Sequence, residues 1–380
     1  MRVAYIAMMG VPSARAQSVH VMKMADALNK LGKLHALILP WRKVDLKKLY
    51  EYYNTSEILV VFLPCLDLMS FAYSRGVRNS ILLGILFRIK HVTFAFSVFF
   101  YMFLRRGYLC WTREPLLTVI AKALSYTTIF DVHGLLSFPR TLMGSALQRA
   151  DLCVALTPSL GEVIRNYNQN IIIAGDCIDL GEFERSEPVD LGEGQHIVYI
   201  GWLSEEKGVY DLIKAWRLLA EANRHLWLVG GGDVWKVKNF INELGLTNIH
   251  VTGPFPHSEA IRYYEAATIA VVPTRKTPFF QFSSPLKLFE AAASKKPIVA
   301  SKIEGNKEFI EDGVNGLLFE EGKPRDLAKK IDQLLKNEEL RQRVATFAYE
   351  RVKKHTWENR AQAVLVKLKS ILSRTRWASL

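Results

Sequence analysis

The stretch Val271–Ser301, VVPTRKTPFFQFSSPLKLFEAAASKKPIVAS, predicts a strand, a loop, a helix and a second strand. The helix is expected to begin at Ser283 or Ser284, because either serine can cap it and Pro285 suits the first helical position. Lys287 then lies in the first turn, where the helix dipole disfavours a cation unless an anion is bound. This pattern favours an anion at the start of the helix.

Glu290 follows Lys287 by three residues, which places both side chains on one face of the predicted helix. A carboxylate can accept two hydrogen bonds from neighbouring hydroxyl groups. The pair therefore suits a phosphate with a polyol beside it. The alternative is an ordinary α/β crossover helix that carries an exposed lysine and glutamate.

The composition of the whole chain narrows these choices. A length of 380 residues predicts two domains, and a formal charge of +13 predicts an anionic partner. That partner is a nucleotide-bearing substrate or a membrane surface rather than nucleic acid, because the basic residues follow no recognised nucleic-acid-binding motif. Four scattered cysteines fit a reducing cytoplasm, and the short apolar N-terminus predicts a first strand rather than a signal peptide.

The N-terminal half alternates short apolar runs with helical patterns, which predicts a doubly wound parallel sheet. Ligands of such sheets bind beyond the carboxyl ends of the strands. Gly10, Arg113 and His133 each follow a predicted strand, so they are candidate site residues, although Gly10 fits a plain turn and His133 a structural loop residue. The strands are expected at Arg2–Met8, Leu34–Leu39, Ile58–Phe62, Tyr108–Trp111, Thr127–Val132 and Leu152–Leu156.

A glycine-rich acidic stretch, Gly181–Gly194, predicts the boundary to a second α/β domain. Its first strand ends at Gly201, and a later strand ends at Gly230, the first of three glycines. Lys207 lies between the first strand and its following helix, so it is a candidate phosphate contact; an exposed lysine in a charged loop is the alternative.

Residues 68–113 contain no Asp or Glu, whereas they contain several arginines. Two apolar runs lie within them, Ile81–Phe87 and Val92–Leu104, each shorter than the ~20 residues that span a bilayer. Arg88, Lys90 and His91 are expected to separate the two runs. We predict contact of residues 75–106 with an anionic membrane surface, with ordinary core helices as the alternative.

Several sites are unsupported by the sequence. The chain has no Asp-x-Asp pair for a carboxylate-bound metal and no Cys/His set with zinc spacing. It also has neither a P-loop nor a nucleophile elbow. No metal and no cofactor are predicted.

The loop Gly201–Gly208 (GWLSEEKG), the triple glycine Gly230–Gly232 and the string Ser283–Glu290 together resemble the family 4 retaining glycosyltransferases of GT-B fold. The likeness covers nearly the whole chain and includes the Asp-x-His-Gly motif at residues 131–134. It implies two Rossmann-like domains facing across a cleft, at residues 1–180 for the acceptor and 181–360 for the nucleotide sugar. A final helix over residues 361–380 would cross back to the first domain.

The resemblance also implies roles for the candidate residues. Glu290 would hold the ribose hydroxyls, Lys207 would neutralise the departing diphosphate, and His133 would lie near the transferred sugar. Gly10 would line the cleft and contact the nucleotide sugar, and Arg113 would line the cleft or the acceptor site, as would His133. The remaining residues implied to bind the nucleotide sugar, UDP- or GDP-linked, are Gly201, Gly230, Ser283, Ser284, Pro285, Leu286 and Lys287.

Two positions depart from the pattern of that family. Trp202 stands where an arginine usually follows the glycine, and Phe282 stands where the first glutamate of a Glu-x7-Glu motif is usual. The resemblance thus predicts a metal-independent hexosyltransferase in the cytoplasm, and the basic apolar region 75–106 adds the prediction that it is peripheral on the inner face of the membrane. A UDP-sugar epimerase of the same fold and a membrane scaffold that binds a nucleotide sugar without turnover are the alternatives.

Overall fold

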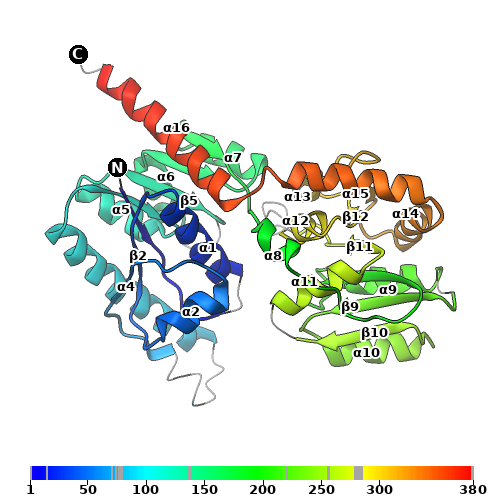
Figure 1. Ribbon diagram of the computed structural model, residues 1–380. Helices are drawn as coiled ribbons and strands as arrows, with labels where there is room; N and C mark the ends of the chain where they lie inside the picture. The colour runs from blue at the N-terminus through cyan, green and yellow to red at the C-terminus, as the bar shows by residue number, and fades with distance from the viewer. Residues whose placement is uncertain are drawn as a thin grey trace. The chain divides into compact units, whose positions relative to one another are not determined.

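The computed structural model describes residues 2–13, 16–69, 72, 75, 80–135, 139–219, 221–254, 257–277 and 286–377. The chain forms two compact units (Figure 1). Unit 1 comprises Met1–Ala174 and Trp357–Leu380, and unit 2 comprises Gly175–Thr356. The sequence predicts domain boundaries after residues 180 and 360, so each division lies a few residues earlier in the structure.

Unit 1 contains a parallel seven-stranded sheet in the order β3-β2-β1-β4-β5-β6-β7. Apolar runs form its strands because both faces of the sheet are covered by helices. The predicted strands are confirmed, with shifts of one or two residues at their ends. The strands of the sheet are β1 (Arg2–Ile6), β2 (Leu34–Pro40), β3 (Val60–Leu63), β4 (Tyr108–Thr112), β5 (Thr128–Val132), β6 (Leu152–Ala155) and β7 (Ile171–Ile173).

The helices of unit 1 bury their apolar sides against this sheet. In α1, for example, Met22, Met24 and Leu28 are fully buried. Loss of this apolar surface from water stabilises the layers by about 25 cal/mol per Å². The helices are α1 (Ala16–Lys30), α2 (Leu46–Tyr53), α4 (Ser80–Leu104), α5 (Pro115–Ala123), α6 (Arg140–Arg149), α7 (Pro158–Arg165) and α16 (Trp357–Trp377).

Unit 2 repeats the architecture with a parallel six-stranded sheet in the order β10-β9-β8-β11-β12-β13. Alternate residues of its strands supply two hydrophobic clusters; Ile197 and Tyr199 lie in one, Val198 and Ile200 in the other. The strands are β8 (Gln195–Ile200), β9 (Arg224–Val229), β10 (Ile249–Gly253), β11 (Ile269–Val272), β12 (Ile298–Ser301) and β13 (Leu317–Phe319). The helices are α8 (Leu180–Glu184), α9 (Val209–Trp216), α10 (Val234–Glu243), α11 (His257–Ala266), α12 (Leu286–Ala293), α13 (Glu304–Lys307), α14 (Pro324–Lys336) and α15 (Glu338–Val352).

Helix α4 corrects one expectation. The apolar runs predicted to be separate form one continuous helix, Ser80–Leu104. The polar residues at the join do not break it because they find partners: Lys90 Nζ lies 2.6 Å from Oδ2 of Asp67, and His91 Nε2 lies 3.5 Å from Oε2 of Glu114. Among the described residues, this is the one helix whose length and composition would allow it to cross a membrane.

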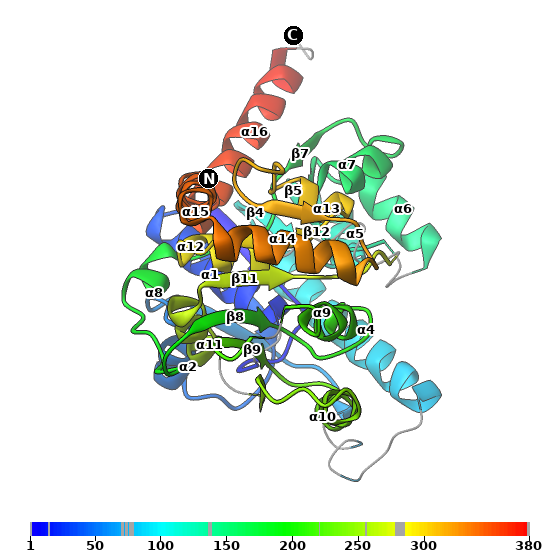
Figure 2. The same cartoon turned by 90° about the vertical axis from the view of Figure 1, so that its right-hand side faces the viewer.

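The two sides of α4 differ. Phe94, Ala95, Val98 and Met102 are buried in the core of unit 1 against the sheet. The opposite side and the N-terminal turns expose apolar residues, and Figure 2 shows α4, in cyan, standing out from unit 1. The exposed apolar residues are Ile81, Leu82, Ile85, Phe87, Val92, Phe96, Phe100, Phe103 and Leu104.

Helix α16 belongs to unit 1 although it ends the chain. It packs against α1, beside which Figure 1 shows it in red. Its first turns bury Ala361, Val364, Leu365 and Leu368, and Arg360 lies on the same buried side. The helix therefore begins at Trp357, a few residues before the crossover helix predicted over residues 361–380.

Candidate functional site

The candidate residues of unit 2 lie at the carboxyl edge of its sheet. Gly201 follows β8, Gly230 follows β9, and α12 is reached by the loop after β11. Strands β9, β8 and β11 are neighbours, so the sheet brings these three loops to one place. Four predicted site residues or neighbours, Phe282, Ser283, Ser284 and Pro285, lie outside the described residues, and α12 is described from Leu286.

Glu290 and Lys287 form an ion pair on α12, as their spacing on one helical face allows. The Lys287 Nζ atom lies 2.7 Å from Oε2 of Glu290. The glutamate side chain is only 2% exposed, whereas the lysine side chain is 31% exposed. The carboxylate is thus buried beside a partner that solvent and ligands can reach.

Lys207 lies in the loop after β8 and is electrostatically coupled to Lys287. Burial, together with the positive charge of Lys287, lowers the pKa of Lys207 to about 8, against the opposing effect of Glu206. A lowered lysine pKa means that the environment disfavours the second positive charge. An anion bound near both ammonium groups would remove this repulsion.

Two glycines allow the loops after β8, β9 and β11 to approach one another closely. Gly208 adopts a φ of +74° and caps α9, and a side chain there would collide with the carbonyl oxygen of Pro273 after β11. Gly230 has a φ of +142°, and a side chain there would collide with the carbonyl oxygen of Gly201. Only glycine combines this backbone conformation with such contacts.

Arg275 fastens the loop after β11 to the Lys207 loop, and the sequence analysis missed it. Its Nε and Nη2 atoms donate to both carboxylate oxygens of buried Asp211 at 2.8 Å, and Nη1 donates to Glu205 at 2.8 Å. Its backbone amide donates to the carbonyl of Glu206. A signal was available, because Arg275 lies in the loop after a buried strand and Asp211 lies in the first turn of the helix after another strand of the same sheet.

Trp202 occupies the position where the resemblance implies an arginine. Its side chain is 63% exposed. Its carbonyl accepts a 2.8 Å hydrogen bond from the Tyr199 hydroxyl. The backbone of this loop is thereby held, while the indole ring itself faces solvent.

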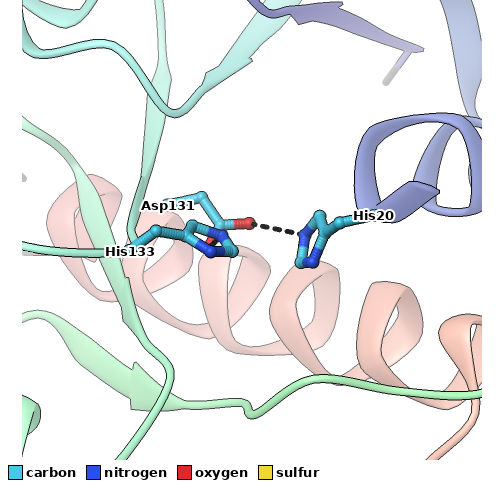
Figure 3. A group of neighbouring side chains, drawn as sticks. All are labelled: His20, Asp131 and His133. Atoms are coloured by element: carbon cyan, nitrogen blue, oxygen red, sulfur yellow. Dashed lines mark ion pairs between the residues drawn. The ribbon is translucent and has the colours of Figure 1, made fainter. Parts of the chain in front are cut away.

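In unit 1, the predicted residue His133 belongs to a buried polar cluster. Figure 3 shows it beside Asp131 of β5 and His20 of α1. The Nε2 atom of His133 lies 3.1 Å from Oδ1 of Asp131, and that of His20 lies 3.9 Å from Oδ2. The two imidazole rings meet edge to face, with centroids 4.6 Å apart.

Arg360 of α16 completes this cluster, and the sequence analysis missed it as well. Its Nη1 and Nη2 atoms donate to both carboxylate oxygens of Asp131 at 3.0 and 2.9 Å. Trp111 donates a further hydrogen bond to the same carboxylate at 3.2 Å. The signal was an acidic residue inside a buried strand, since such a charge requires a partner.

The ionisation states of this cluster follow from its contacts. Burial raises the pKa of Asp131, but the charge of Arg360 and the contacts with His133 and His20 outweigh it and hold the pKa well below its usual range. Burial and the charge of Arg113 lower the pKa of His133 to about 3, against the opposing effect of Asp131. At neutral pH, His133 is therefore an uncharged imidazole beside a carboxylate.

The geometry of His20, Asp131 and His133 also resembles a metal site, because their ligand atoms lie within 4.8 Å of one another. The donor set fits a metal ion poorly. Both oxygens of Asp131 accept hydrogen bonds from Arg360. A cation would thus have to displace the guanidinium or share its carboxylate.

The other two predicted residues of unit 1 follow strands of the sheet and contact the first turn of α1. Gly10 follows β1, and its carbonyl accepts a 3.4 Å hydrogen bond from Ser18 of α1. Arg113 follows β4, and its Nη1 atom donates to the carbonyl of Gln17 at 3.4 Å. The sheet thus gathers Gly10, Arg113 and His133 at one edge, as the sequence predicts.

The pattern that defines the family described as "Glycosyl transferases group 1" matches residues 182–351. The matched segment makes up somewhat less than half of the chain and is similar to the group 1 glycosyl transferases. It accounts for most of unit 2 and contains Lys207, Lys287 and Glu290.

Two named relatives each match less than half of the chain. An uncharacterized glycosyltransferase of Methanocaldococcus jannaschii is 32% identical over 162 residues, which are 42% of this chain and 44% of that protein. A D-inositol 3-phosphate glycosyltransferase of Thermobifida fusca is 25% identical over 193 residues, 47% of this chain and 43% of that protein. The chain spans less than half the length of these relatives.

A solved structure resembles the chain along nearly its whole length. Anabaena HepE in complex with UDP has a TM-score of 0.73 and 16% identity, with 97% of this chain and 100% of that chain covered. This likeness confirms the predicted fold class, a GT-B fold with two Rossmann-like domains.

Proposed function

We propose that the protein is a hexosyltransferase that moves a sugar from a nucleoside-diphosphate sugar to an acceptor with retention of anomeric configuration. The observation that carries the proposal is the arrangement of Lys207, Lys287 and Glu290 within the segment that is similar to the group 1 glycosyl transferases. Two lysines whose charges repel each other, next to a buried carboxylate, suit a diphosphate joined to a ribose.

The diphosphate is the natural occupant of the space near the lysines. Charge-assisted hydrogen bonds from ammonium groups to phosphate are stronger than neutral ones. When the sugar leaves, negative charge grows on the diphosphate, and a prearranged cation stabilises that charge most. Lys207 and Lys287 can therefore take the part that a divalent metal plays elsewhere, so we propose a metal-independent reaction without a cofactor.

The remaining predicted residues receive supporting roles in this proposal. Glu290 accepts hydrogen bonds from the ribose hydroxyls; the contacts predicted for Ser283, Ser284 and Pro285 lie outside the described residues. His133, which is uncharged at neutral pH, contacts the sugar as a hydrogen-bonding group rather than as a cation. The solved complex of Anabaena HepE with UDP favours UDP as the nucleotide, and a GDP-sugar is the alternative.

We further propose that the enzyme works at the inner, cytoplasmic face of a membrane. One side of α4 is fixed in the core of unit 1, and the other exposes large apolar residues that include Phe96 and Phe100. Arg105 and Arg106 follow the helix and are exposed. An apolar helix face flanked by arginines suits a helix lying in the surface of an anionic membrane.

Nucleotide binding tests the transferase proposal. We expect UDP to bind at least one order of magnitude more tightly than uridine, as measured by calorimetry. Lys207→Ala should weaken UDP binding by about 1.5–3 kcal/mol, roughly ten- to hundred-fold, and leave uridine binding unchanged, because it removes one charge-assisted contact to phosphate. Glu290→Gln should weaken both ligands.

Lys214→Ala is the matched control, since Lys214 is an exposed lysine of α9. Sugar release from UDP- and GDP-sugars, with the product anomer read by NMR, tests turnover and retention. Equal UDP affinity in the wild type and in Lys207→Ala would refute the assignment of this site.

A further inference from the structure

A basic residue that has no role so far, Arg42, lies at the carboxyl edge of unit 1. It follows β2, the strand beside β1, and is exposed. Its guanidinium reaches the loop after β1, because a methyl group at Gly10 would lie 3.2 Å from the Nη1 atom. Glycine at this position thus lets the Arg42 side chain lie directly over the backbone of its neighbour.

The loop beneath Arg42 is held by contacts within unit 1. The Tyr53 hydroxyl of α2 accepts a 2.7 Å hydrogen bond from the Ser13 amide and donates a 2.8 Å hydrogen bond to the Ser13 carbonyl. Burial raises the pKa of Tyr53, and the charge of Arg42 acts in the opposite direction, as expected for neighbouring groups. Arg42 is therefore presented on a supported surface.

Arg113 approaches the same loop from the other side. It follows β4, which pairs with β1 on the edge opposite to β2. Adjacent strands are about 4.8 Å apart, so β2 and β4 lie roughly 10 Å from each other. Arg113 reaches toward the start of α1 through its contact with Gln17, and the two arginines flank the β1–α1 connection.

The carboxylates of this region are engaged elsewhere. Asp131 is paired with Arg360, Glu114 with His91, and Asp67 with Lys90. Asp45 accepts hydrogen bonds from the first amides of α2. Within the part of the chain that the structure describes, neither Arg42 nor Arg113 forms an ion pair, so the edge carries two uncompensated positive charges.

We infer that Arg42 and Arg113 bind a phosphate group carried by the acceptor. The planar guanidinium offers paired N–H donors that match phosphate oxygens, and ligands of parallel α/β sheets bind at this edge. The inference rests on the proposed function, because it names the class of the second substrate. The phosphate belongs either to a soluble phosphorylated sugar or polyol, or to a lipid headgroup.

The experiment measures binding of glycerol 3-phosphate by calorimetry to the full-length protein already saturated with UDP. Saturation with UDP keeps the probe out of the nucleotide site. Arg42→Ala and Arg113→Ala should each weaken the probe at least tenfold and leave UDP affinity and Tm unchanged. Arg149→Ala, which removes an exposed charge from α6 of the same unit, is the control and should change nothing.

Vesicles separate the two sources of phosphate. A lipid-borne acceptor predicts that the arginine variants lose binding to phosphatidic acid vesicles while glycerol 3-phosphate binds poorly even to the wild type. Unchanged affinity for both probes in Arg42→Ala and Arg113→Ala would overturn the inference. If the wild type does not bind UDP but still binds glycerol 3-phosphate, and the arginine variants do not, the proposed function alone would be refuted.

Discussion

A buried acidic residue of unit 1, Asp131 in β5, can be compared with one of unit 2, Glu290 in α12. Asp131 accepts two hydrogen bonds from Arg360, and neither side chain is more than 2% exposed. Glu290 is buried as deeply, but its partner Lys287 is 31% exposed. In unit 1 both the buried carboxylate and its partner are enclosed, whereas in unit 2 the partner of the buried carboxylate is accessible to solvent.

The difference separates a structural ion pair from a binding site. Asp131 and Arg360 satisfy each other, and nothing at that pair calls for a ligand. Lys287 satisfies Glu290 and at the same time repels Lys207, whose pKa it helps to lower. A site that keeps unfavourable electrostatics in its free state gains most when the ligand supplies the missing charge.

The largest expected effect concerns the enclosed pair. Arg360→Ala should lower the free energy of unfolding by about 3–5 kcal/mol, because it leaves the Asp131 charge buried without its partner. Urea unfolding followed by circular dichroism measures this loss. The double variant Asp131→Leu with Arg360→Met should recover much of it; a loss below about 1 kcal/mol in Arg360→Ala would show that the pair is not structural.

At the accessible site in unit 2, we expect an effect on the pH dependence of UDP affinity rather than on the free energy of unfolding. Lys207 has a pKa of about 8 in the free protein, and a bound diphosphate would raise it. Below pH 8 the ammonium is already charged; above pH 8 UDP binding must take up a proton, so UDP affinity should fall by up to about tenfold per pH unit. Calorimetry between pH 7 and pH 9.5 measures the slope.

Two variants sharpen this second test. Lys207→Arg should bind UDP with little dependence on pH in that range, because arginine stays protonated. Lys287→Ala should move the midpoint of the profile upward, because it removes the repelling charge. A wild-type profile as flat as that of Lys207→Arg would contradict the lowered pKa of Lys207, and an unchanged midpoint in Lys287→Ala would contradict the coupling between the two lysines.

The smallest expected effect concerns a third environment for charge, the exposed end of α4. Arg105→Glu with Arg106→Glu should weaken flotation with anionic liposomes at least fivefold, because each basic residue near such a surface contributes about 1 kcal/mol. Arg149→Glu with Arg165→Glu is the control on α6 and α7. Flotation that is indifferent to both pairs of changes would leave α4 as an ordinary helix of unit 1.

Sequence patterns were sufficient for the sheets but not for all of the sites. Apolar runs with glycine turns located the strands, because burial on both faces leaves a clear signal. The i, i+3 spacing of Lys287 and Glu290 likewise anticipated their contact. Their positions indicate that Asp131 and Asp211 need partners, but they do not identify Arg360 and Arg275, which lie far along the chain and meet them only through tertiary packing.

Helix α4 shows a different limit. A lysine and a histidine between two apolar runs indicate an interruption when read locally. Asp67 and Glu114, from elsewhere in unit 1, contact the lysine and the histidine, so the helix continues through them. Local polarity therefore predicts a break only where the fold offers the polar groups no partner.

The return of α16 to unit 1 gives the order of synthesis a physical meaning. Unit 2 is one continuous segment, so it can fold as soon as residues 175–356 have left the ribosome. Unit 1 is translated first but waits for the end of the chain, because Arg360 is made 229 positions after Asp131. During this interval the Asp131 carboxylate lacks the Arg360 guanidinium. Unit 1 is therefore synthesised first in large part but completes its fold after unit 2.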